Sequence, residues 1–256
     1  MEIRIHTPPF DCQAVLALWG DIFGKAEAEL ERPQIDGSEA EWNEDVVFAA
    51  WEGDCLLGAV HTTAPRQTPG ICGISGVCTS PAARGKGVGK ALFAAAVDHM
   101  EKAGAEVMVL GTANPVAAKL YHSFGFAYQP GSNVMMRFRS GDWVDFERET
   151  YATPTQVRVV PADPSMRIPL VPLVLRRSGP MVLDCNTGLF NRSVLTQLSC
   201  MGLYPKYMDL ADRGGNAFGL VDERGVLGGM ASVELTPDGA RADLFFADSF
   251  AYGFYG

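Results

Sequence analysis

A glycine-rich loop between an apolar strand and a helix constrains the fold of this chain more than any other segment. From Gly70 to Lys102 the sequence predicts a strand, a tight loop and a helix, with three glycines spaced two apart where the helix begins. Because glycine has no Cβ atom, several backbone N–H groups can converge there on one anion, and the positive end of the helix dipole adds to the attraction. With three cationic side chains around it, the loop predicts a phosphate or pyrophosphate site. The loop consists of Arg84, Gly85, Lys86, Gly87, Val88, Gly89 and Lys90.

Two well-known phosphate loops do not fit this spacing. A Walker loop needs Gly, four residues and then Gly-Lys-Ser/Thr, whereas Gly89-Lys90 is followed by Ala91 and position 84 is Arg. A dinucleotide fingerprint needs a third glycine three residues after Gly87, and that position is Lys90. Both nucleotide-binding classes are therefore excluded for this loop.

The loop and its flanks fit a third pattern, in which an apolar strand with a proline near its end leads into Arg/Gln-x-x-Gly-x-Gly/Ala. Here Pro81 precedes the run from Arg84 to Gly89, which matches every position. The stretch resembles the acetyl-CoA motif of the GNAT acetyltransferase superfamily. The resemblance implies that backbone amides from Gly85 to Lys90 hold the CoA pyrophosphate. It also implies that an exposed strand backbone pairs with the pantetheine arm like an added strand, at Val77, Cys78 and Thr79.

A second motif supports the same resemblance. The chain after Glu106 predicts a buried strand (Val107 to Leu110), a turn, a short helix and a strand opened by Gly-Phe. GNAT proteins carry an Asn, a helix bearing a Tyr, and Gly-Phe in this order and spacing, which Asn114, Tyr121 and Phe124–Phe126 supply. A glycine-rich loop alone also occurs as a solvated turn before an ordinary helix. The two motifs together imply an acetyl-CoA site that includes Asn114 and Tyr121.

The length of 256 residues suggests about two domains. For residues 1–145 the resemblance implies an α/β (α+β) fold, the GNAT acyl-CoA N-acyltransferase fold, with a mixed, mostly antiparallel sheet flanked by helices. The sheet is expected to splay between the strand ending at Thr79 and the strand Val107 to Leu110. Near-continuous apolar strands predict burial on both faces. Residues 142–156 are expected to form a linker or an exposed surface helix.

Residues 155–256 resemble a weaker copy of the front of the first half. Phe48–Val60 and Phe218–Met230 align without a gap at an offset of 170, and both read as strand, turn, strand. Apolar spacing predicts a helix at Leu189–Gly202, and a third strand is expected at Ala240–Ala247. No glycine-rich loop follows, so this half resembles an incomplete GNAT domain that cannot hold CoA in the family's manner. Chance similarity of two hairpins is the alternative, because hairpin patterns recur widely.

Composition excludes several classes of partner. A formal net charge of −9 argues against nucleic acid, since phosphate backbones require basic surfaces. The chain has no run of about 18 apolar residues that could span a bilayer, and its N-terminus lacks the apolar core of a signal peptide. We therefore expect a cytoplasmic protein without a membrane partner. The six cysteines and four histidines show no metal-ligand spacing, which predicts reduced thiols and no metal.

Acidic residues gather in the segment from Lys25 to Asp45, where only Lys25 and Arg32 oppose them. In a GNAT fold this segment lies beside the acceptor pocket, and a negative rim there would attract an amine-bearing cation. The alternative is a solvated helix face and loop. The acidic residues are Glu27, Glu29, Glu31, Asp36, Glu39, Glu41, Glu44 and Asp45.

Acetyl transfer to an amine needs a base for the amine, a donor for the oxyanion and a proton for the leaving thiolate. By resemblance, Tyr121 protonates the thiolate and the backbone N–H near Val77 faces the acetyl oxygen, although a core tyrosine is the alternative. Many family members carry the base on the fourth strand, but Ile71–Thr79 contains no carboxylate. His61, the acidic segment and water remain open as bases. Cys78 could carry a transient acyl group, but such cysteines are usually small buried hydrophobes.

The sequence therefore predicts an acetyl-CoA-dependent N-acetyltransferase that moves an acetyl group to a primary amine, with a cationic small molecule favoured as acceptor. Acetyl-CoA would be the donor cosubstrate, and no metal is expected. The second half would shape the acceptor pocket or mediate a homodimer. One alternative is a non-catalytic acetyl-CoA-binding or sensing protein, and another is an interaction protein that keeps only the fold. Acetyl-CoA binding and amine-dependent turnover distinguish the three.

Overall fold

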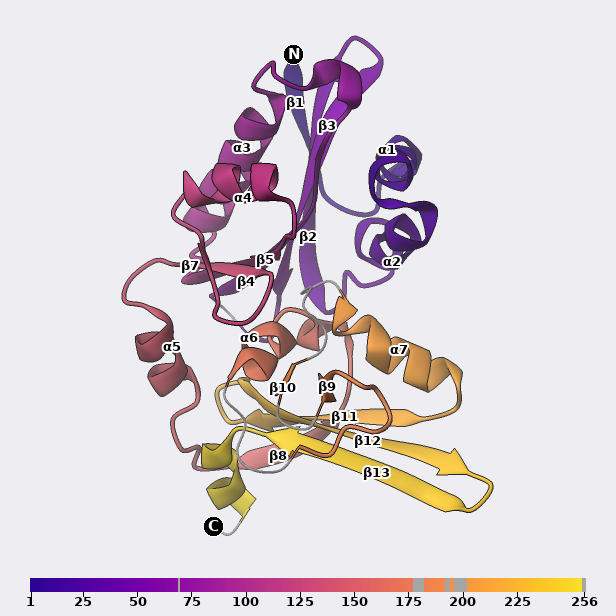
Figure 1. Ribbon diagram of the computed structural model, residues 1–256, viewed down its shortest axis with the longest axis vertical. Helices are drawn as coiled ribbons and strands as arrows, with labels where there is room; N and C mark the ends of the chain where they lie inside the picture. The colour runs from indigo at the N-terminus through magenta and orange to yellow at the C-terminus, as the bar shows by residue number, and fades with distance from the viewer. Residues whose placement is uncertain (69, 177–181, 192–193, 196–201, 255–256) are drawn as a thin grey trace.

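Two large β-sheets, each with its own helices, and a short two-stranded sheet form the described part of the computed structural model of the protein (Figure 1). The structure describes residues 1–68, 70–176, 182–191, 194–195 and 202–254. The first half of the chain forms a seven-stranded sheet, and the second half forms a four-stranded sheet. In Figure 1 the second sheet lies below the first, at the end of the molecule that contains the C-terminus.

The first sheet is mixed and mostly antiparallel, which confirms the predicted fold class. Its strands are β1 (Glu2–His6), β2 (Asn43–Glu52), β3 (Cys55–Pro65), β4 (Ile71–Thr79), β5 (Val107–Gly111), β6 (Ala127–Tyr128) and β7 (Val134–Phe138). They lie in the order β1-β2-β3-β4-β5-β7-β6, and β4 and β5 are the neighbours that run parallel. The predicted strands of this half are therefore present.

Helices cover both faces of this sheet (Figure 1). They are α1 (Gln13–Phe23), α2 (Lys25–Ile35), α3 (Val88–Lys102) and α4 (Pro115–His122). On β2, Val47 packs into the cluster under α1 and α2, while its neighbour Phe48 packs into the cluster under α3 and α4. Successive strand residues point to opposite faces. Burial on both faces therefore explains why these strands are apolar at nearly every position.

The sheet opens between β4 and β5, as the sequence predicts. Their parallel pairing is limited to Ile71–Gly73 on β4 and Val107–Val109 on β5. Beyond this point β4 continues beside β3, and β5 continues beside β7. The part of β4 from Ile74 to Thr79 therefore has no strand partner on its β5 side among the described residues.

Helix α5 (Trp143–Thr150) leads from the first half to the second. The Asp142 side chain begins the helix, because its Oδ1 accepts hydrogen bonds from the backbone N–H groups of Val144 (2.8 Å) and Asp145 (3.1 Å). Phe146 of α5 packs on Phe138 of β7, with 5.7 Å between ring centroids. The segment expected to be a linker or a surface helix therefore contains a helix that packs on the first sheet.

The second sheet repeats the strand order of β1 to β4. Its strands are β8 (Val157–Pro161), β11 (Asn216–Asp222), β12 (Leu227–Thr236) and β13 (Gly239–Phe246), with helices α6 (Leu170–Leu175) and α7 (Pro205–Asp212) between β8 and β11. All pairs are antiparallel, in the order β13-β12-β11-β8. The two aligned hairpins differ by one residue in register, since Phe48 pairs with Val60 whereas Phe218 pairs with Ala231.

The helix predicted at Leu189–Gly202 is wrong where the structure describes this segment. Two short strands, β9 (Phe190–Asn191) and β10 (Val194–Leu195), pair antiparallel there. Residues 192–193 and 196–201 lie outside the described residues. The Asp184 carboxylate accepts hydrogen bonds from the backbone N–H groups of Gly188 (3.2 Å) and Phe190 (2.8 Å). Such side-chain bonds compete with helical ones, and they stabilise a turn into β9 instead.

The two halves share one hydrophobic core. Ile168 of the second half lies so close to Gly73 of β4 that a Cβ atom on Gly73 would be 2.3 Å from Ile168 Cδ1. The first sheet contributes Ile71, Val107, Val109, Val134 and Met136 to this cluster, and the second half contributes Met166, Ile168, Leu170, Val171, Leu173, Val174, Met230 and Phe245, among others. The expected division into 1–145 and 155–256 stays a prediction, and the two parts are not separately packed.

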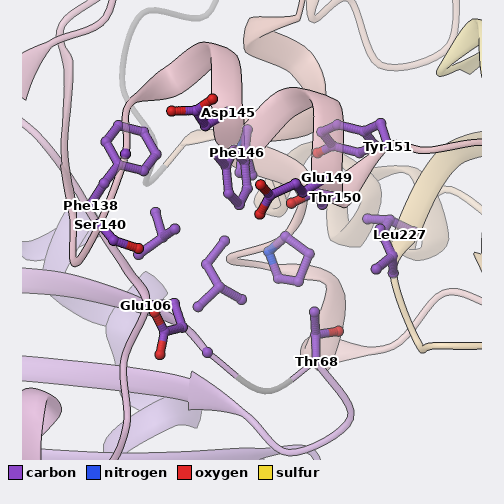
Figure 2. Close-up of a pocket in the computed structure, with 17 residues that line it drawn as sticks. Thr68, Glu106, Phe138, Ser140, Asp145, Phe146, Glu149, Thr150, Tyr151 and Leu227 are labelled. Atoms are coloured by element: carbon purple, nitrogen blue, oxygen red, sulfur yellow. The ribbon is translucent and has the colours of Figure 1, made fainter.

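A cavity of about 540 Å³ lies where α5 meets both halves (Figure 2). Phe138, Phe146 and Leu227 contribute to its apolar wall, and the carboxylates of Glu106 and Glu149 point toward it. None of the residues predicted for acetyl-CoA lines this cavity. The candidate active site lies elsewhere, at the opening between β4 and β5.

Candidate active site

The glycine-rich loop has the geometry expected of an anion site. Gly85 and Gly87 adopt left-handed φ values of +76° and +80°, and both face open space. The first hydrogen bond of α3 runs from the Ala91 N–H to the Gly87 carbonyl at 3.0 Å. The N–H groups of residues 88–90 therefore have no partner within the helix. Val88 anchors the turn in the core, whereas Arg84, Lys86 and Lys90 are exposed around it.

Strand β4 carries a bulge beside its open edge. Between Ser75 and Cys78 it has one residue more than the paired stretch of β3. Gly76 takes a φ of +58° there, and its carbonyl accepts a hydrogen bond from Trp19 Nε1 at 2.8 Å. A Cβ atom on Gly76 would lie 2.4 Å from the Trp19 ring, so a side chain cannot fit. The bulge and its tryptophan contact fix the path of β4 just before Val77.

A cleft of about 320 Å³ lies in the opening between β4 and β5. It brings together Val77, Asn114 and Tyr121, three residues that the sequence predicts for acetyl-CoA. The Asn114 Oδ1 caps α4 by accepting a hydrogen bond from the Val116 N–H at 2.9 Å. The cleft is lined by Trp19, Phe23, Glu27, Ala28, Glu31, Ile74, Ser75, Gly76, Val77, Leu110, Gly111, Thr112, Asn114, Ala117 and Tyr121.

Tyr121 serves the core and the cleft at once. Its ring is 4% exposed and packs against Phe93 of α3, with 4.8 Å between ring centroids. The same side chain also forms part of the cleft wall. The core role considered from the sequence is therefore real, but it does not exclude contact with a bound thioester.

Cys78 and Thr79 lie just outside the cleft lining. The Thr79 carbonyl accepts a hydrogen bond from Arg84 Nε at 3.4 Å, and a Cβ atom on Gly89 would lie 3.0 Å from Thr79 Oγ1. The strand end and the start of α3 are therefore in close contact. Burial raises the pKa of the Cys78 thiol to about 11. A buried, protonated thiol is a poor nucleophile, which argues against an acyl-Cys step.

The acidic segment divides into residues with different environments. Glu27 and Glu31 of α2 line the cleft. Glu29 faces solvent, where its carboxylate accepts a hydrogen bond from Arg32 Nε at 2.6 Å. Glu39 and Asp45 are buried. Two carboxylates of α2 therefore face the cleft, as a negative rim would, whereas Glu29 faces solvent and Glu39 and Asp45 make buried contacts.

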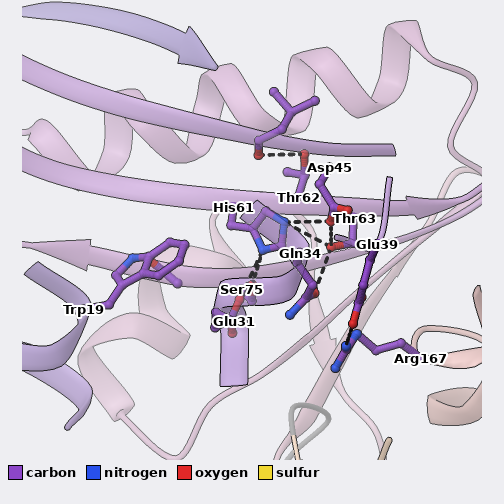
Figure 3. A network of polar contacts seen from close by, with 12 residues as sticks. Trp19, Glu31, Gln34, Glu39, Asp45, His61, Thr62, Thr63, Ser75 and Arg167 are labelled. Carbon is purple, nitrogen blue, oxygen red and sulfur yellow. Dashed lines mark hydrogen bonds and ion pairs between the residues drawn. The ribbon is translucent and has the colours of Figure 1, made fainter. Parts of the chain in front are cut away.

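His61 lies behind the cleft between two carboxylates (Figure 3). Its Nε2 is 2.9 Å from Asp45 Oδ1, and its Nδ1 is 3.1 Å from Glu31 Oε2 and 2.8 Å from Ser75 Oγ. The Ser75 hydroxyl donates to the same Glu31 oxygen at 2.7 Å, and the Thr63 hydroxyl donates to Asp45 Oδ1 at 2.7 Å. The network links β2, β3, β4 and α2 directly behind the cleft.

The environment of His61 argues against its role as a base. Burial lowers its pKa, but the hydrogen bonds and charges of Asp45 and Glu31 outweigh this effect and raise the pKa to about 9. His61 is therefore an imidazolium at neutral pH and has no free lone pair. The sequence left His61 open as a base because an unperturbed histidine has a near-neutral pKa, but two carboxylates distant in the sequence converge on this ring.

Glu31 is a cleft residue that sequence reasoning named only as one of the carboxylates that would attract a cationic acceptor. It lies in the cleft wall, and its carboxylate is fixed by Ser75 and His61. The sequence placed it only within an acidic segment of eight carboxylates. Its contacts are 30 and 44 positions away along the chain, so no local pattern could have identified it.

The part of the chain that the structure describes contains neither a candidate metal site nor a candidate membrane-spanning helix. No group of three or more His, Cys, Asp or Glu side chains there could hold a metal ion. No helix in the described ranges is long and apolar enough to cross a membrane.

Comparison with known proteins gives a family match to this region. Residues 12–126 match the model of the acetyltransferase (GNAT) family. The match includes the glycine-rich loop, both cleft strands and Tyr121. A mycothiol acetyltransferase of Renibacterium salmoninarum is 36% identical over 137 residues, which are 50% of this chain and 40% of that protein. The matched region is thus less than half of that relative's length.

Solved structures also align with the chain. A GNAT family acetyltransferase of Brucella melitensis, in complex with acetyl-CoA, aligns with a TM-score of 0.44 and 19% identity over 55% of this chain and 90% of that chain. A GCN5-related N-acetyltransferase of Kribbella flavida aligns with a TM-score of 0.41 and 15% identity over 99% of this chain and 59% of that chain.

Proposed function

We propose that the protein is an acetyl-CoA-dependent N-acetyltransferase, because residues 12–126 match the model of the acetyltransferase (GNAT) family. It transfers an acetyl group to a primary amine, and a cationic small molecule is the favoured acceptor. The observation that supports this best is the cleft itself, where Val77, Asn114 and Tyr121 converge at the opening between β4 and β5.

The residues present fit acetyl-CoA. Gly85 and Gly87 leave open space above a helix start whose N–H groups lack helical partners, which suits a pyrophosphate. The strand edge from Ile74 to Thr79 can pair with the amide-containing pantetheine arm in the manner of an added strand. When bound, acetyl-CoA supplies an activated acyl group on a thiolate that leaves readily.

The amine is held by the acidic and aromatic wall of the cleft. Glu27 and Glu31 attract a cationic acceptor, and the exposed ring of Phe23 offers a face to its organic part. The amine must lose a proton before its nitrogen can attack the thioester carbonyl. We assign the acceptance of this proton to the Glu31 carboxylate, because Ser75 and His61 fix its orientation.

Two further groups act at the reacting atoms. The backbone N–H near Val77, held at the bulge of β4, faces the oxyanion that forms as the amine adds. The Tyr121 hydroxyl donates its proton to the CoA thiolate as the C–S bond breaks, and the second proton that the amine nitrogen loses as the amide forms restores the hydroxyl. The products are the N-acetylated amine and free CoA.

Release of CoA thiol from acetyl-CoA in the presence of polyamines, aminoglycosides, amino acids and N-terminal peptides tests this function. We expect turnover with one class of amine, and about 10²-fold slower turnover in Tyr121→Phe with unchanged acetyl-CoA affinity. Tyr151→Phe is the matched control, because Tyr151 is equally buried but lines the other cavity. No turnover with any amine, with acetyl-CoA still raising the Tm, would instead support a sensing protein.

The charge of the acceptor is tested separately by two variants of α2. Glu27→Gln removes a carboxylate that lines the cleft, so the KM of a cationic acceptor should rise about fivefold, as expected for one partly exposed charge pair. Glu29→Gln removes one that faces solvent and pairs with Arg32, so that KM should not change. Equal effects of the two variants would contradict a cationic acceptor bound beside α2. A cytoplasmic location and a homodimer stay predictions of the sequence.

A further inference from the structure

A buried ion pair between Arg167 and Glu39 joins the second half to the loop between α2 and β2 (Figure 3). Arg167 is 3% exposed, and its Nη2 donates to Oε1 of Glu39, which is 4% exposed, at 2.5 Å. The guanidinium also lies over the ring of Tyr204, 5.0 Å from its centroid. Burial raises the pKa of Glu39, and Arg167 opposes this effect. The Arg167 guanidinium therefore favours the ionised form of Glu39 against the effect of burial.

Glu39 lies in the loop between α2 and β2 and is tied to both ends of it. Its N–H donates to the Pro33 carbonyl at 3.0 Å, within the last turn of α2. Its own carbonyl accepts from the N–H of Asn43, the first residue of β2, at 3.0 Å. The Asn43 side chain adds a second tie to the other half, because its Nδ2 donates to the Pro164 carbonyl at 3.2 Å. The second half thus holds this loop at two buried points.

The two elements on either side of this loop carry the two carboxylates that hold His61. Helix α2 carries Glu31, and β2 carries Asp45. The imidazolium ring of His61 lies between these two carboxylates and hydrogen-bonds to both. Any shift of α2 relative to β2 therefore changes the position of the Glu31 carboxylate in the cleft wall.

Arg167 also lies next to the hydrogen-bond network around His61. Together with Gln34, Thr63 and Ser75 it lines a small cavity of about 10 Å³. Arg167 Nε and Gln34 Nε2 are buried and have no hydrogen-bond partner in the described protein. The Thr63 hydroxyl is 3.3 Å from Gln34 Oε1, which links this cavity to Asp45. The guanidinium therefore affects the network through Glu39 and through the polar groups of this cavity.

We propose that Arg167 is a positioning residue for Glu31, so that the second half of the chain sets the geometry of the proposed base in the first half. This inference rests on the proposed function, because Glu31 has a catalytic role only if acetyl transfer occurs. It also gives the second half a defined role, since the glycine-rich loop and the cleft strands belong to the first half.

The test must separate positioning from simple stabilisation. Removing Arg167 alone leaves a buried, unpaired carboxylate, which destabilises folding whatever the pair does for catalysis. The double variant Arg167→Met/Glu39→Gln removes both charges and leaves no charge unpaired. A second ion pair, which joins the second half to the connecting helix α5 and is less buried, provides the control: Arg176 Nε donates to Glu147 at 3.0 Å, and its guanidinium lies over the Tyr151 ring. Its counterpart variant is Arg176→Met/Glu147→Gln.

We expect both double variants to fold and to bind acetyl-CoA with wild-type Kd. The kcat of Arg167→Met/Glu39→Gln should fall about 10-fold to 100-fold, as for a small displacement of a catalytic group, and its pH profile should shift. The control should keep the wild-type kcat and profile. Wild-type kcat and pH profile in a folded Arg167→Met/Glu39→Gln would overturn the proposal. If that variant does not fold, Arg167→Lys keeps the charge without the forked geometry, and an unchanged kcat in Arg167→Lys would overturn it equally.

The ¹⁵N NMR signals of the His61 ring provide a readout that does not need turnover. The charged groups near this ring are Glu31 on α2, Asp45 on β2, and the Glu39 and Arg167 pair. In the wild type the ring should remain doubly protonated well above neutral pH. In Arg167→Met/Glu39→Gln its titration midpoint should move to lower pH, and in the control it should not. A shifted midpoint without any acetyl transfer would reject the proposed function but keep the coupling, whereas acetyl transfer with unchanged midpoint and kcat would reject the coupling alone.

Discussion

At the scale of single residues, the charge on His61 is the least expected property of this molecule. A fully buried imidazole loses hydration, which favours the neutral ring. Two carboxylates within hydrogen-bond distance reverse that preference and raise its pKa from 6.5 to about 9. The folded state therefore binds a proton that the unfolded chain releases near pH 6.5.

This raised pKa gives stability a definite pH dependence. A group whose pKa is higher in the folded state stabilises the fold fully below its unfolded pKa, and the stabilisation is lost as the pH rises through the folded pKa. The free energy of unfolding should therefore be level just below pH 6.5 and fall by a few kcal/mol between pH 6.5 and about pH 9. Urea unfolding at several pH values measures this change.

Two histidine variants serve as references for that experiment. His61→Gln cannot gain the proton, so the fall between pH 6.5 and 9 should disappear. His122→Gln changes an exposed histidine of α4 and should keep the fall. A free energy of unfolding that stays constant across this range in the wild type would show that His61 is neutral when folded.

The contrast between Tyr121 and Glu31 shows what a sequence can say about single residues. Tyr121 was predicted because it stands at a fixed spacing from Asn114 and a Gly-Phe pair, and the structure places it in the cleft wall. Glu31 stands in no sequence motif, since its hydrogen-bond partners lie on β3 and β4. Local motifs identify residues whose neighbours are close in sequence, whereas a charge network assembled from four elements exists only after folding.

At the scale of elements, the start of α3 is where local sequence and geometry agree best. Gly87 has a left-handed φ of +80°, a conformation that residues with a Cβ atom rarely adopt. The open space around it and the N–H groups that follow form the proposed pyrophosphate site. The alternation of glycines in the sequence therefore specifies both the turn and its proposed ligand.

Gly87→Ala tests whether this turn binds acetyl-CoA. Alanine strains the left-handed turn and should cost about 1 kcal/mol of stability, and the Kd for acetyl-CoA should rise about tenfold as backbone contacts to the phosphates are lost. Gly104→Ala is the matched control. Gly104 has a φ of +87° in equally open space just beyond α3, so it should lose similar stability with no change in Kd. An equal change in Kd for both variants would place the pyrophosphate elsewhere.

Helices and strands were predictable from the sequence where the spacing of their apolar residues was regular and nothing outside the segment altered it. The central parts of the strands β2, β3 and β4 are apolar because helices cover both faces, and a near-continuous apolar pattern of this kind predicts a buried strand. The segment at Leu189–Gly202 has helical spacing, yet the Asp184 carboxylate accepts hydrogen bonds from backbone N–H groups, and two short strands pair at Phe190–Asn191 and Val194–Leu195. Hydrogen bonds from backbone N–H groups to a side chain outside the periodic segment therefore compete with the helix that its spacing predicts.

At the scale of the whole molecule, the halves resemble each other in strand order but depend on each other for their core. The offset of 170 identified the repeated hairpin, but its register differs by one residue. The contact between the halves was not predictable, because apolar residues of β5 and β7 look the same whether a helix or another domain covers them. Covering by the second half also explains why Gly73 has no room for a side chain.

A shared core predicts that both halves unfold in one step. Every tryptophan lies before residue 150, so tryptophan fluorescence reports on the first half and the connecting helix; they are Trp19, Trp42, Trp51 and Trp143. Ile168→Ala creates a cavity at the contact with Gly73, although Ile168 belongs to the second half. It should lower the free energy of unfolding detected by tryptophan fluorescence by about 2–4 kcal/mol. Fluorescence and far-UV circular dichroism should then give one coincident transition in urea.

The control for this experiment is Leu235→Ala on β12, where the side chain is 77% exposed. Its effect on the fluorescence transition should stay within about 0.5 kcal/mol, as for most surface substitutions. If Ile168→Ala left the fluorescence transition at its wild-type midpoint while circular dichroism detected a second, earlier transition, the halves would be independent domains. Coincident transitions would mean instead that the first half needs the second to cover the sheet that forms its cleft.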